Sequence, residues 1–537
     1  MRKSKELLKA FELQMGLCGK GEKRWFWAAF VLLVLYVEFV VFARNAAAGH
    51  IKTMLQAVAA VPLCFLCFLV ASRWKISGEA RRAGDRTDLR GRIRFAAAVW
   101  GLTFFVFFLC LMANWPGGFS PDSISQYGQA VSGSYDNWHP VLQTWLFFRL
   151  PLLILRSPDG IVPLQLLWFS LAVTYLFCVL YANGCPEVFL ACGWLYIAAN
   201  PNTLFIMIFP WKDSALIIAS TVMFAQLVQI YLTKGTWLKK WYNLASFSAF
   251  AFLTLEMRHN SVLLVIPVFV ILICFFKSVR KRILLSASTV FLAHLLLYGP
   301  VFSLAHVQLP GNRTVETMGL PMTVLSDIYV QDREALSEDA RAFMDSLAPQ
   351  EAWGSYSLGN FNSIKLSGNL DGSLIEKAGY ERLLQYTVDA AMKRPDLAWK
   401  AFSLLTRTVW GAKSGDGWRL GPYIHDNPYG IDWHGNGLLQ YVFNIYSALV
   451  SVFITKYLFR YVGGVILVLL FLAVGNLGGG NLGRVFLVLA PMAYNFGTML
   501  LLTGPDFRFF QFNFVIAVPL IYLMLRRKEA SDDAVQE

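Results

Sequence analysis

Long apolar runs recur along this chain, and each one limits what the sequence can fold into. A helix needs about 17 to 25 apolar residues to cross roughly 30 Å of hydrocarbon. Nine runs of about this length precede residue 303, and four shorter or more interrupted runs follow residue 437. They cover 25–43, 54–72, 95–113, 161–182, 187–209, 214–233, 242–256, 261–276 and 283–302, and then 438–458, 460–474, 485–502 and 512–525.

These runs predict transmembrane helices rather than a membrane barrel. Apolar residues are continuous within each run, whereas the strands of a barrel alternate apolar and polar residues. Hydrophobic residues make up 56% of the 537 positions and charged residues 15%, a composition that excludes an ordinary soluble protein. We therefore predict an all-α polytopic membrane protein.

Lys and Arg gather in a few segments, which we assign to the cytoplasmic face because translocating basic residues is unfavourable. The first 24 residues hold seven, residues 73–94 hold eight, and the segments 234–240, 277–282 and 526–528 hold ten more. The net charge of +13 is therefore a topology signal and not a nucleic-acid footprint. If the interrupted run 438–458 lies in the outer interface, about twelve helices cross the membrane and both termini are cytoplasmic.

The apolar runs and the distribution of Lys and Arg divide the chain into five predicted parts. Residues 303–437 carry 12 Lys and Arg against 16 Asp and Glu, as in an extracytoplasmic domain. None of the eight cysteines lies in that domain, which argues against a disulfide framework and a zinc site. The parts are a basic N-terminus with a two-helix anchor (1–94), a membrane core with its first outer loop at 114–160 (95–302), the extracytoplasmic domain (303–437), the interfacial helix and last membrane helices (438–525), and a cytoplasmic tail (526–537).

Polar residues stand at the predicted outer ends of four helices. Charged groups at the hydrocarbon boundary are unfavourable unless they are paired or used, so these residues are candidates for a functional site. Lys212 or Arg258 alone could instead extend to phospholipid headgroups. The candidates are Asp122, Asp136 and His139 after 95–113, Lys212 and Asp213 after 187–209, Arg258, His259 and Asn260 after 242–256, and Asp506 and Arg508 before 512–525.

The residue types in this set indicate a chemistry. Lys212, Arg258 and Arg508 suit the oxygens of a lipid phosphate or pyrophosphate, to which they can donate charge-assisted hydrogen bonds. Asp122 suits a general base that takes a proton from a hydroxyl. Together they describe the transfer of a group from a phosphorylated lipid to an alcohol.

Three short motifs resemble the GT-C superfamily of multi-span glycosyltransferases, which use polyprenyl-phosphate sugars. They are the carboxylate in the first large outer loop, the sequence Trp138-His139-Pro140 after it, and Asp506-Phe507-Arg508 before the final run. The chain is similar in particular to bacterial proteins like the protein O-mannosyltransferases and the aminoarabinose transferase of lipid A. It departs from that pattern in the additional helices at 25–72 and in an outer domain that follows nine helices.

The resemblance implies an inverting glycosyltransferase in a bacterial inner membrane. Asp122 would be the base, with Asp136 and His139 beside it, and the three cations would bind the carrier phosphate. Supporting residues would be Asp213, His259, Asn260, Tyr127, Trp138 and Asp506.

The partners implied are a polyprenyl-phosphate-linked sugar, membrane lipids, and a glycan, lipid or protein acceptor, with no nucleic acid. No cofactor is required, although Asp122 and Asp136 could hold a divalent metal. A multi-span transporter or lipid flippase is the alternative function, since it would also need many helices and buried charges.

A second aromatic and polar segment, 415–437, lies at the end of the predicted outer domain. Aromatic faces beside hydrogen-bonding side chains suit a sugar, which stacks its C–H face and bonds through its hydroxyls. The segment is also consistent with a Gly- and Pro-rich loop whose aromatics anchor at the membrane surface. Candidates for acceptor binding are Trp418, Tyr423, His425, Asp432, Trp433 and His434.

Overall fold

The structure of the protein is a computed structural model. It describes residues 20–44, 88–309, 314–411, 419–452, 455–477 and 482–526, with a few single residues before 67. Every regular element in these ranges is a helix, and isolated bridges join Phe119 to Ile424 and Asp136 to Gln308. The all-α prediction is confirmed. Trp418, most of the predicted run 54–72 and the tail beyond Arg526 lie outside the described residues.

Six helices among the described residues are long and apolar enough to cross a membrane. A bent pair makes up to seven, and four further apolar helices are shorter. These lengths and compositions are those of a multi-pass membrane protein. The six are Lys23–Ala43, Leu89–Met112, Pro158–Ala182, Lys212–Leu232, Lys277–Leu304 and Phe507–Leu525, and the shorter ones are Val141–Leu155, His259–Phe275, Gly437–Val452 and Val462–Leu477.

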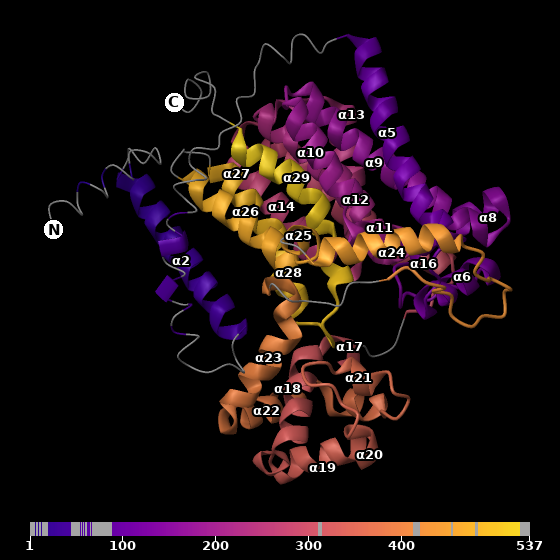
Figure 1. Cartoon of the computed structure of the whole chain (residues 1–537), viewed down its shortest axis with the longest axis vertical. Helices are drawn as coiled ribbons and strands as arrows, with labels where there is room; N and C mark the ends of the chain where they lie inside the picture. The colour runs from indigo at the N-terminus through magenta and orange to yellow at the C-terminus, as the bar shows by residue number, and fades with distance from the viewer. Residues whose placement is uncertain are drawn as a thin grey trace.

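The long helices form one bundle around α12, which is buried along nearly its whole length. In Figure 1, α5, α9, α12 and α13 form one side of the bundle, while α26, α27 and α29 lie nearer the N-terminal helix α2. Helix α2 packs against α26 and α23. The bounds are α2 (Lys20–Arg44), α5 (Leu89–Met112), α9 (Ile161–Ala182), α12 (Lys212–Leu232), α13 (Trp241–Glu256), α14 (Val262–Phe275), α15 (Arg280–Leu296), α16 (Phe302–Leu304), α26 (Val462–Leu477) and α29 (Phe512–Leu525).

The predicted run 187–209 is broken into α10 (Glu187–Ala198) and α11 (Pro201–Met207), which are bent by 58°. Asn200 Oδ1 accepts hydrogen bonds from the backbone N–H groups of Asn202 and Thr203 at 2.9 and 3.1 Å. Pro201 has no N–H to continue the first helix. An N-cap in the middle of the run therefore starts a second helix there. The run 485–502 is likewise divided into α27 (Leu482–Leu487) and α28 (Leu489–Met499).

Helix α24 (Gly437–Val452) lies crosswise to the long helices, and α25 (Thr455–Phe459) follows it (Figure 1). Much of its apolar surface is exposed, including Leu438, Tyr441 and Val452. An apolar face on which none of the described residues packs suits a helix lying in the plane of a lipid interface.

A separate helical unit occupies 314–410 and has its own apolar core. At its centre, Asp327 accepts hydrogen bonds from the Tyr356 hydroxyl and the Gly359 N–H, both at 2.8 Å. Burial raises the pKa of Asp327, although these two bonds oppose the rise. The helices of the unit are α17 (Thr314–Thr317), α18 (Gly319–Gln331), α19 (Glu338–Leu347), α20 (Gln350–Trp353), α21 (Asn362–Lys365), α22 (Gly372–Lys393) and α23 (Pro395–Trp410).

The helical unit meets the bundle beside the segment that leads into α29. The Asn362 N–H donates to the Thr503 carbonyl at 2.9 Å, and the Lys365 ammonium lies 3.3 Å from the Thr503 hydroxyl. Helix α6 (Pro121–Ser132) and α24 lie at this same end of the bundle in Figure 1. The helical unit therefore stands at the end that carries the predicted site residues.

Candidate functional site

Asp122 lies in the first turn of α6, where the helix dipole favours a negative charge. Ser120 is the N-cap of this helix, and its hydroxyl accepts from the Ser123 N–H at 3.4 Å. The same hydroxyl is 2.8 Å from the indole nitrogen of Trp211, which directly precedes α12. A hydrogen bond therefore joins the start of α6 to the start of α12.

The carboxylate of Asp122 faces two residues that the sequence placed in the same site. One of its oxygens is 4.0 Å from His139 Nε2, and the other is 3.6 Å from a terminal nitrogen of Arg508. Burial acts to raise the pKa of Asp122, but Arg508, His139, Lys212 and Arg258 together hold it below the ordinary value. Asp122 is thus a carboxylate at neutral pH, and its side chain is 38% exposed, which leaves it open to a ligand.

His139, whose Nε2 lies 4.0 Å from Asp122, is almost fully buried. Burial and the charge of Lys212 lower its pKa to about 3, and the opposing effect of Asp122 is smaller. The imidazole is therefore neutral at pH 7, so it can orient the carboxylate or an acceptor through hydrogen bonds but contributes no charge.

Two arginines lie against the same aromatic ring, that of Phe509, at this end of the bundle. The guanidinium carbons of Arg258 and Arg508 lie 4.0 and 5.2 Å from the ring centroid of Phe509. Arg508 also lies 5.1 Å from the ring of Trp211, and its Nε is 2.7 Å from an oxygen of Asp506. Cation–π contacts and an ion pair hold both guanidinium groups in place.

Arg258 is buried and paired more tightly than Arg508. It forms an ion pair with Asp213, and its Nε donates to the Asn260 side chain at 2.8 Å. Asn260 in turn donates to the Thr498 hydroxyl at 2.8 Å on α28. This chain of contacts joins the starts of α12 and α14 to α28.

Lys212 is the first residue of α12, directly before Asp213. It forms no ion pair with the residues that the structure describes. A helix N-terminus already carries partial positive charge, so an unpaired lysine there is electrostatically unfavourable. Lys212 and Arg508, a terminal nitrogen of which lies 3.6 Å from Asp122, are the cations available to an anion at this site. His259 follows Arg258 in the same short turn.

Asp136 lies away from Asp122. Its oxygens accept from the Gln129 amide at 3.0 Å and from the Trp138 N–H at 2.9 Å. Gln129 lies seven residues along α6 from Asp122, about 10 Å at 1.5 Å per residue. Asp136 thus shapes the loop between α6 and α7 (Val141–Thr144), and the two carboxylates do not share a ligand position.

The segment 419–436 packs along the first loop, so the two regions singled out in the sequence are neighbours. The Phe119 N–H donates to the Tyr423 carbonyl and the His425 N–H to the Phe119 carbonyl, both at 2.8 Å. The His434 N–H donates to the Trp115 carbonyl at 2.9 Å. These bonds attach the segment directly to the loop that carries Asp122.

Side chains of this segment present a polar surface beside α6. Tyr423, His425, Asp432 and His434 are exposed, and Trp433 is half-buried. A further aromatic, Tyr429, packs edge to face on Tyr127 of α6 with ring centroids 5.0 Å apart.

Several residues of the site have no distinct signal in the sequence. The Phe509 ring contacts the guanidinium groups of Arg258 and Arg508, and the Trp211 ring contacts that of Arg508. Tyr429 packs the 419–436 segment against α6. A buried group consisting of Gln126, Gln143 and Thr144 ties α6 to α7, and the Gln143 amide reaches the Pro210 carbonyl at 3.3 Å. The only sequence signal for Trp211 and Phe509 is that each adjoins a charged residue already singled out.

The residues that the structure describes contain no group of three or more His, Cys, Asp or Glu side chains arranged to hold a metal ion. The chain matches no protein-family model, no curated protein and no solved structure. The chemistry of the site therefore has to be argued from its geometry.

Proposed function

We propose that the protein is an inverting glycosyltransferase that moves a monosaccharide from a polyprenyl-phosphate carrier to a hydroxyl of a glycan, lipid or protein. The observation that carries this proposal is the ionised Asp122 beside Arg508 and Lys212 at one end of an apolar helix bundle. A base next to cations at a membrane boundary is what a phosphorylated lipid donor and an alcohol acceptor require. The GT-C resemblance of the same residues supports this assignment.

The donor phosphate would be bound by Lys212 and Arg508, with the buried Arg258 on the same Phe509 ring as Arg508. Arginine and lysine donate charge-assisted hydrogen bonds to phosphate oxygens and stabilise the negative charge that develops as the phosphate leaves. These cations can neutralise the leaving group without a metal. The proposed reaction therefore requires no cofactor, and activity that survives a chelator would support this point.

Transfer would proceed by a single displacement. Asp122 takes the proton of the acceptor hydroxyl, the hydroxyl oxygen bonds to the anomeric carbon, and the bond from that carbon to the phosphate oxygen breaks. The configuration at the anomeric carbon inverts. The 3.6 Å contact of Arg508 with Asp122 is longer than a hydrogen-bonded ion pair, so the carboxylate stays free to act as base while Arg508 binds the phosphate.

The acceptor would approach from the 419–436 segment, whose exposed polar side chains lie along α6. In this arrangement about twelve helices cross a bacterial inner membrane, α24 lies in the outer interface, the helical unit is extracytoplasmic and both termini are cytoplasmic. The exposed apolar face of α24 and the contact of the helical unit with Thr503, close to Arg508, support that orientation.

The test is the release of free polyprenyl phosphate from a panel of polyprenyl-phosphate sugars by the purified protein with crude envelope acceptors. We expect release from one donor, with the sugar appearing on an acceptor. Folded protein that releases no phosphate from any donor, but moves a fluorescent lipid across proteoliposomes, would favour the transporter or flippase instead.

A further inference from the structure

A groove of about 400 Å³ lies between α13 and α15, away from the candidate site. Leu244 and Val290, which line it, are buried, whereas the lining residues Ala245, Ala249 and Leu285 are exposed. The groove is therefore open sideways to the medium that surrounds the bundle, and a ligand can enter it without a conformational change.

The groove presents an apolar surface although three hydroxyl groups line it. The hydroxyls of Ser248 and Ser286 are hydrogen-bonded to each other at 2.7 Å. The Thr289 hydroxyl donates to the Leu285 carbonyl at 2.9 Å. Because these hydroxyls already have partners inside the protein, hydrocarbon can lie on them without breaking a hydrogen bond.

The length of the groove matches the depth of one lipid leaflet. It follows α13 from Trp241 to Phe252, which is eleven residues or about 16 Å of helix. The hydrocarbon of one leaflet is about 15 Å deep, half of the roughly 30 Å core. Trp241 is 76% exposed, and tryptophans of membrane proteins gather at the level of the lipid headgroups. We therefore expect the Trp241 end of the groove at the headgroups and the Phe252 end in the hydrocarbon.

Cations gather at the headgroup end of the groove. Lys239 and Lys240, both exposed, come directly before α13. Arg282 lies three residues before Leu285, on the face of α15 that lines the groove. One of its terminal nitrogens is 3.5 Å from the Leu238 carbonyl. That contact brings the start of α15 to the segment that leads into α13, so the three cations lie around one end of the groove.

The charge of these cations is not neutralised by the helices that carry them. No Asp or Glu occurs in 214–255 or in 257–315. Neither α13 nor α15 has an acidic residue in its first turn, where the backbone N–H groups add partial positive charge. This end of the groove therefore suits an anion such as a phosphate.

We propose that the groove binds an anionic phospholipid, with one acyl chain between α13 and α15 and the phosphate on Lys239, Lys240 and Arg282. This inference does not depend on the proposed function. The lipid carries its charge and its hydrocarbon in the order in which the cations and the groove occur, and basic pockets between membrane helices bind such headgroups. A second copy of the chain, packed here about a twofold axis along the membrane normal, would instead bring like charges together.

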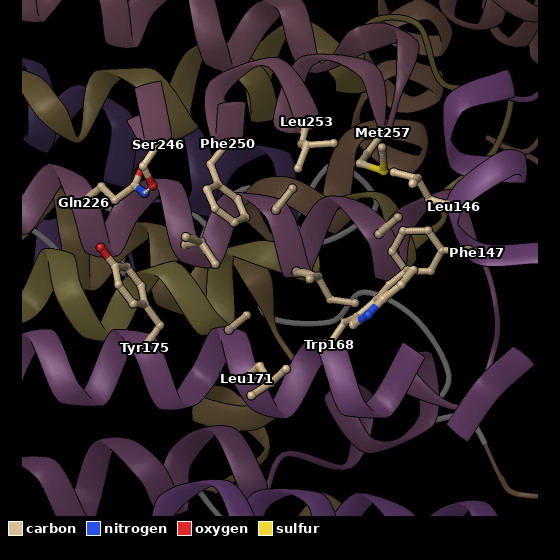
Figure 2. A pocket seen from close by; sticks show the side chains of 15 residues that line it. Leu146, Phe147, Trp168, Leu171, Tyr175, Gln226, Ser246, Phe250, Leu253 and Met257 are labelled. Atoms are coloured by element: carbon tan, nitrogen blue, oxygen red, sulfur yellow. Dashed lines mark hydrogen bonds between the residues drawn. The ribbon is translucent and has the colours of Figure 1, made fainter. Parts of the chain in front are cut away.

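A cavity on another face of α13 provides a comparison. It measures about 430 Å³ and lies between α9, α12 and α13 (Figure 2). The residues that line it include Leu171 and the hydrogen-bonded pair of Gln226 and Ser246, and none of them is Lys or Arg. It offers space for hydrocarbon but no cation for a headgroup.

The first experiment tests the headgroup. Native mass spectrometry of the full-length protein in detergent gives the dissociation constants of the first bound dioleoyl phosphatidylglycerol and of the first dioleoyl phosphatidylcholine. Each basic residue near an anionic lipid adds roughly fivefold in affinity, so we expect phosphatidylglycerol to bind about tenfold or more tightly than phosphatidylcholine. Lys240→Gln combined with Arg282→Gln should reduce this preference below about threefold.

The matched control removes the same charge from the same basic region. It combines Lys277→Gln with Arg280→Gln, and the Arg280 side chain is directed away, with its Nε 3.0 Å from the Ile273 carbonyl. This variant should keep the preference for phosphatidylglycerol.

The second experiment tests the chain. Ala245→Trp should fill the groove and weaken the binding of phosphatidylglycerol about fivefold or more, since apolar contact area is lost. Leu171→Trp, in the cavity of Figure 2, should leave that binding unchanged. Glycerol phosphate, which has the phosphate but no chain, should fail to displace phosphatidylglycerol at equal concentration.

Each assignment has its own contrary result. Equal binding of the two lipids by the wild type overturns the anionic headgroup, and a preference lost equally in the control variant overturns the three cations as the site. Unchanged binding in Ala245→Trp overturns the groove, and displacement by glycerol phosphate overturns the role of the chain. A wild-type dimer that Ala245→Trp converts to a monomer would assign the groove to a second copy instead.

Discussion

At the residue scale, the neighbours of Asp122, the candidate base, determine its pKa. Burial alone would favour protonated Asp122, and Arg508 is the largest opposing influence. A carboxylate whose pKa is lowered keeps its charge as the pH falls, and loses it only below its ordinary value of about 3.9. The neutral His139 adds no second titration near pH 6.5, because its own pKa is about 3.

The first prediction concerns the pH–rate profile of kcat/KM. In the wild type we expect a plateau from pH 7 to about 5, with loss of rate only at lower pH as Asp122 takes up a proton. Arg508→Gln removes the main lowering influence, so the pKa of Asp122 rises and the acid limb moves to higher pH, in addition to a lower rate. Arg333→Gln, at an exposed ion pair of the helical unit, is the control. Acid limbs at the same pH in Arg508→Gln and the wild type would contradict the coupling.

The second prediction concerns the buried pair of Arg258 and Asp213. Asp213→Ala leaves a buried guanidinium without its carboxylate, which typically costs about 3–5 kcal/mol. We expect a large drop in melting temperature in detergent, and recovery of much of that stability in the double variant with Arg258→Met. Donor binding should not recover, because a cation has been lost. A single variant as stable as the wild type would show that the pair is not needed for the fold.

At the element scale, the sequence predicted the helices well where apolar residues were continuous and less well where a cap interrupted them. The predicted runs for α5, α9, α12, α15 and α29 overlap the observed helices closely. The break at Asn200 was missed because the hydropathy of 187–209 stays high through it, and only the capping bonds reveal a second helix. Charges at the ends of four predicted helices were expected to converge, and Asp122, Arg508 and Arg258 do so.

Side-chain partners were harder to predict than helices. Asp136 and His139 are three residues apart, yet only His139 faces Asp122. The difference depends on the path of the loop, which is fixed by backbone bonds of Tyr135 and Asn137 with the distant Gln308. The packing of 419–436 along the loop before α6 likewise depends on long-range backbone bonds, to Trp115 and Phe119, that leave no pattern in the sequence.

The third prediction tests that packing. Tyr429→Ala removes the edge-to-face contact with Tyr127, which is worth about 0.5–1.5 kcal/mol beyond burial. If the 419–436 segment positions the acceptor, KM for the acceptor should rise severalfold while KM for the donor stays unchanged. Tyr380→Ala, an exposed tyrosine of the helical unit, serves as the control. A rise in donor KM instead would place the segment on the donor side.

At the scale of the whole molecule, the orientation of the bundle in the membrane decides which side of the membrane the site faces. Helix α24, the helical unit and the start of α6 lie at one end of the bundle (Figure 1). The basic segment that leads into α15 follows α14, whose other end carries Arg258. If that basic segment is cytoplasmic, the site faces the opposite side.

The fourth prediction is the sidedness of these segments. In a variant with all eight cysteines replaced, Ser346→Cys in the helical unit should react with a membrane-impermeant maleimide in intact spheroplasts, because it is exposed and, in the proposed orientation, extracytoplasmic. Ser278→Cys, exposed in the basic segment before α15, should react only after the membrane is opened. Labelling of Ser278→Cys in intact spheroplasts would contradict the proposed orientation.

The most direct test of the proposed function is a comparison of Asp122→Asn with Asp136→Asn in sugar transfer from the polyprenyl-phosphate donor. The account predicts that Asp122→Asn loses about 10²-fold to 10⁴-fold in rate, as expected for a general base. Asp136→Asn should stay within about tenfold of the wild type, because the oxygens of Asp136 only shape a loop. The product should have the inverted anomeric configuration. Undiminished turnover by Asp122→Asn, or retention of configuration, would contradict the assigned base and the single displacement.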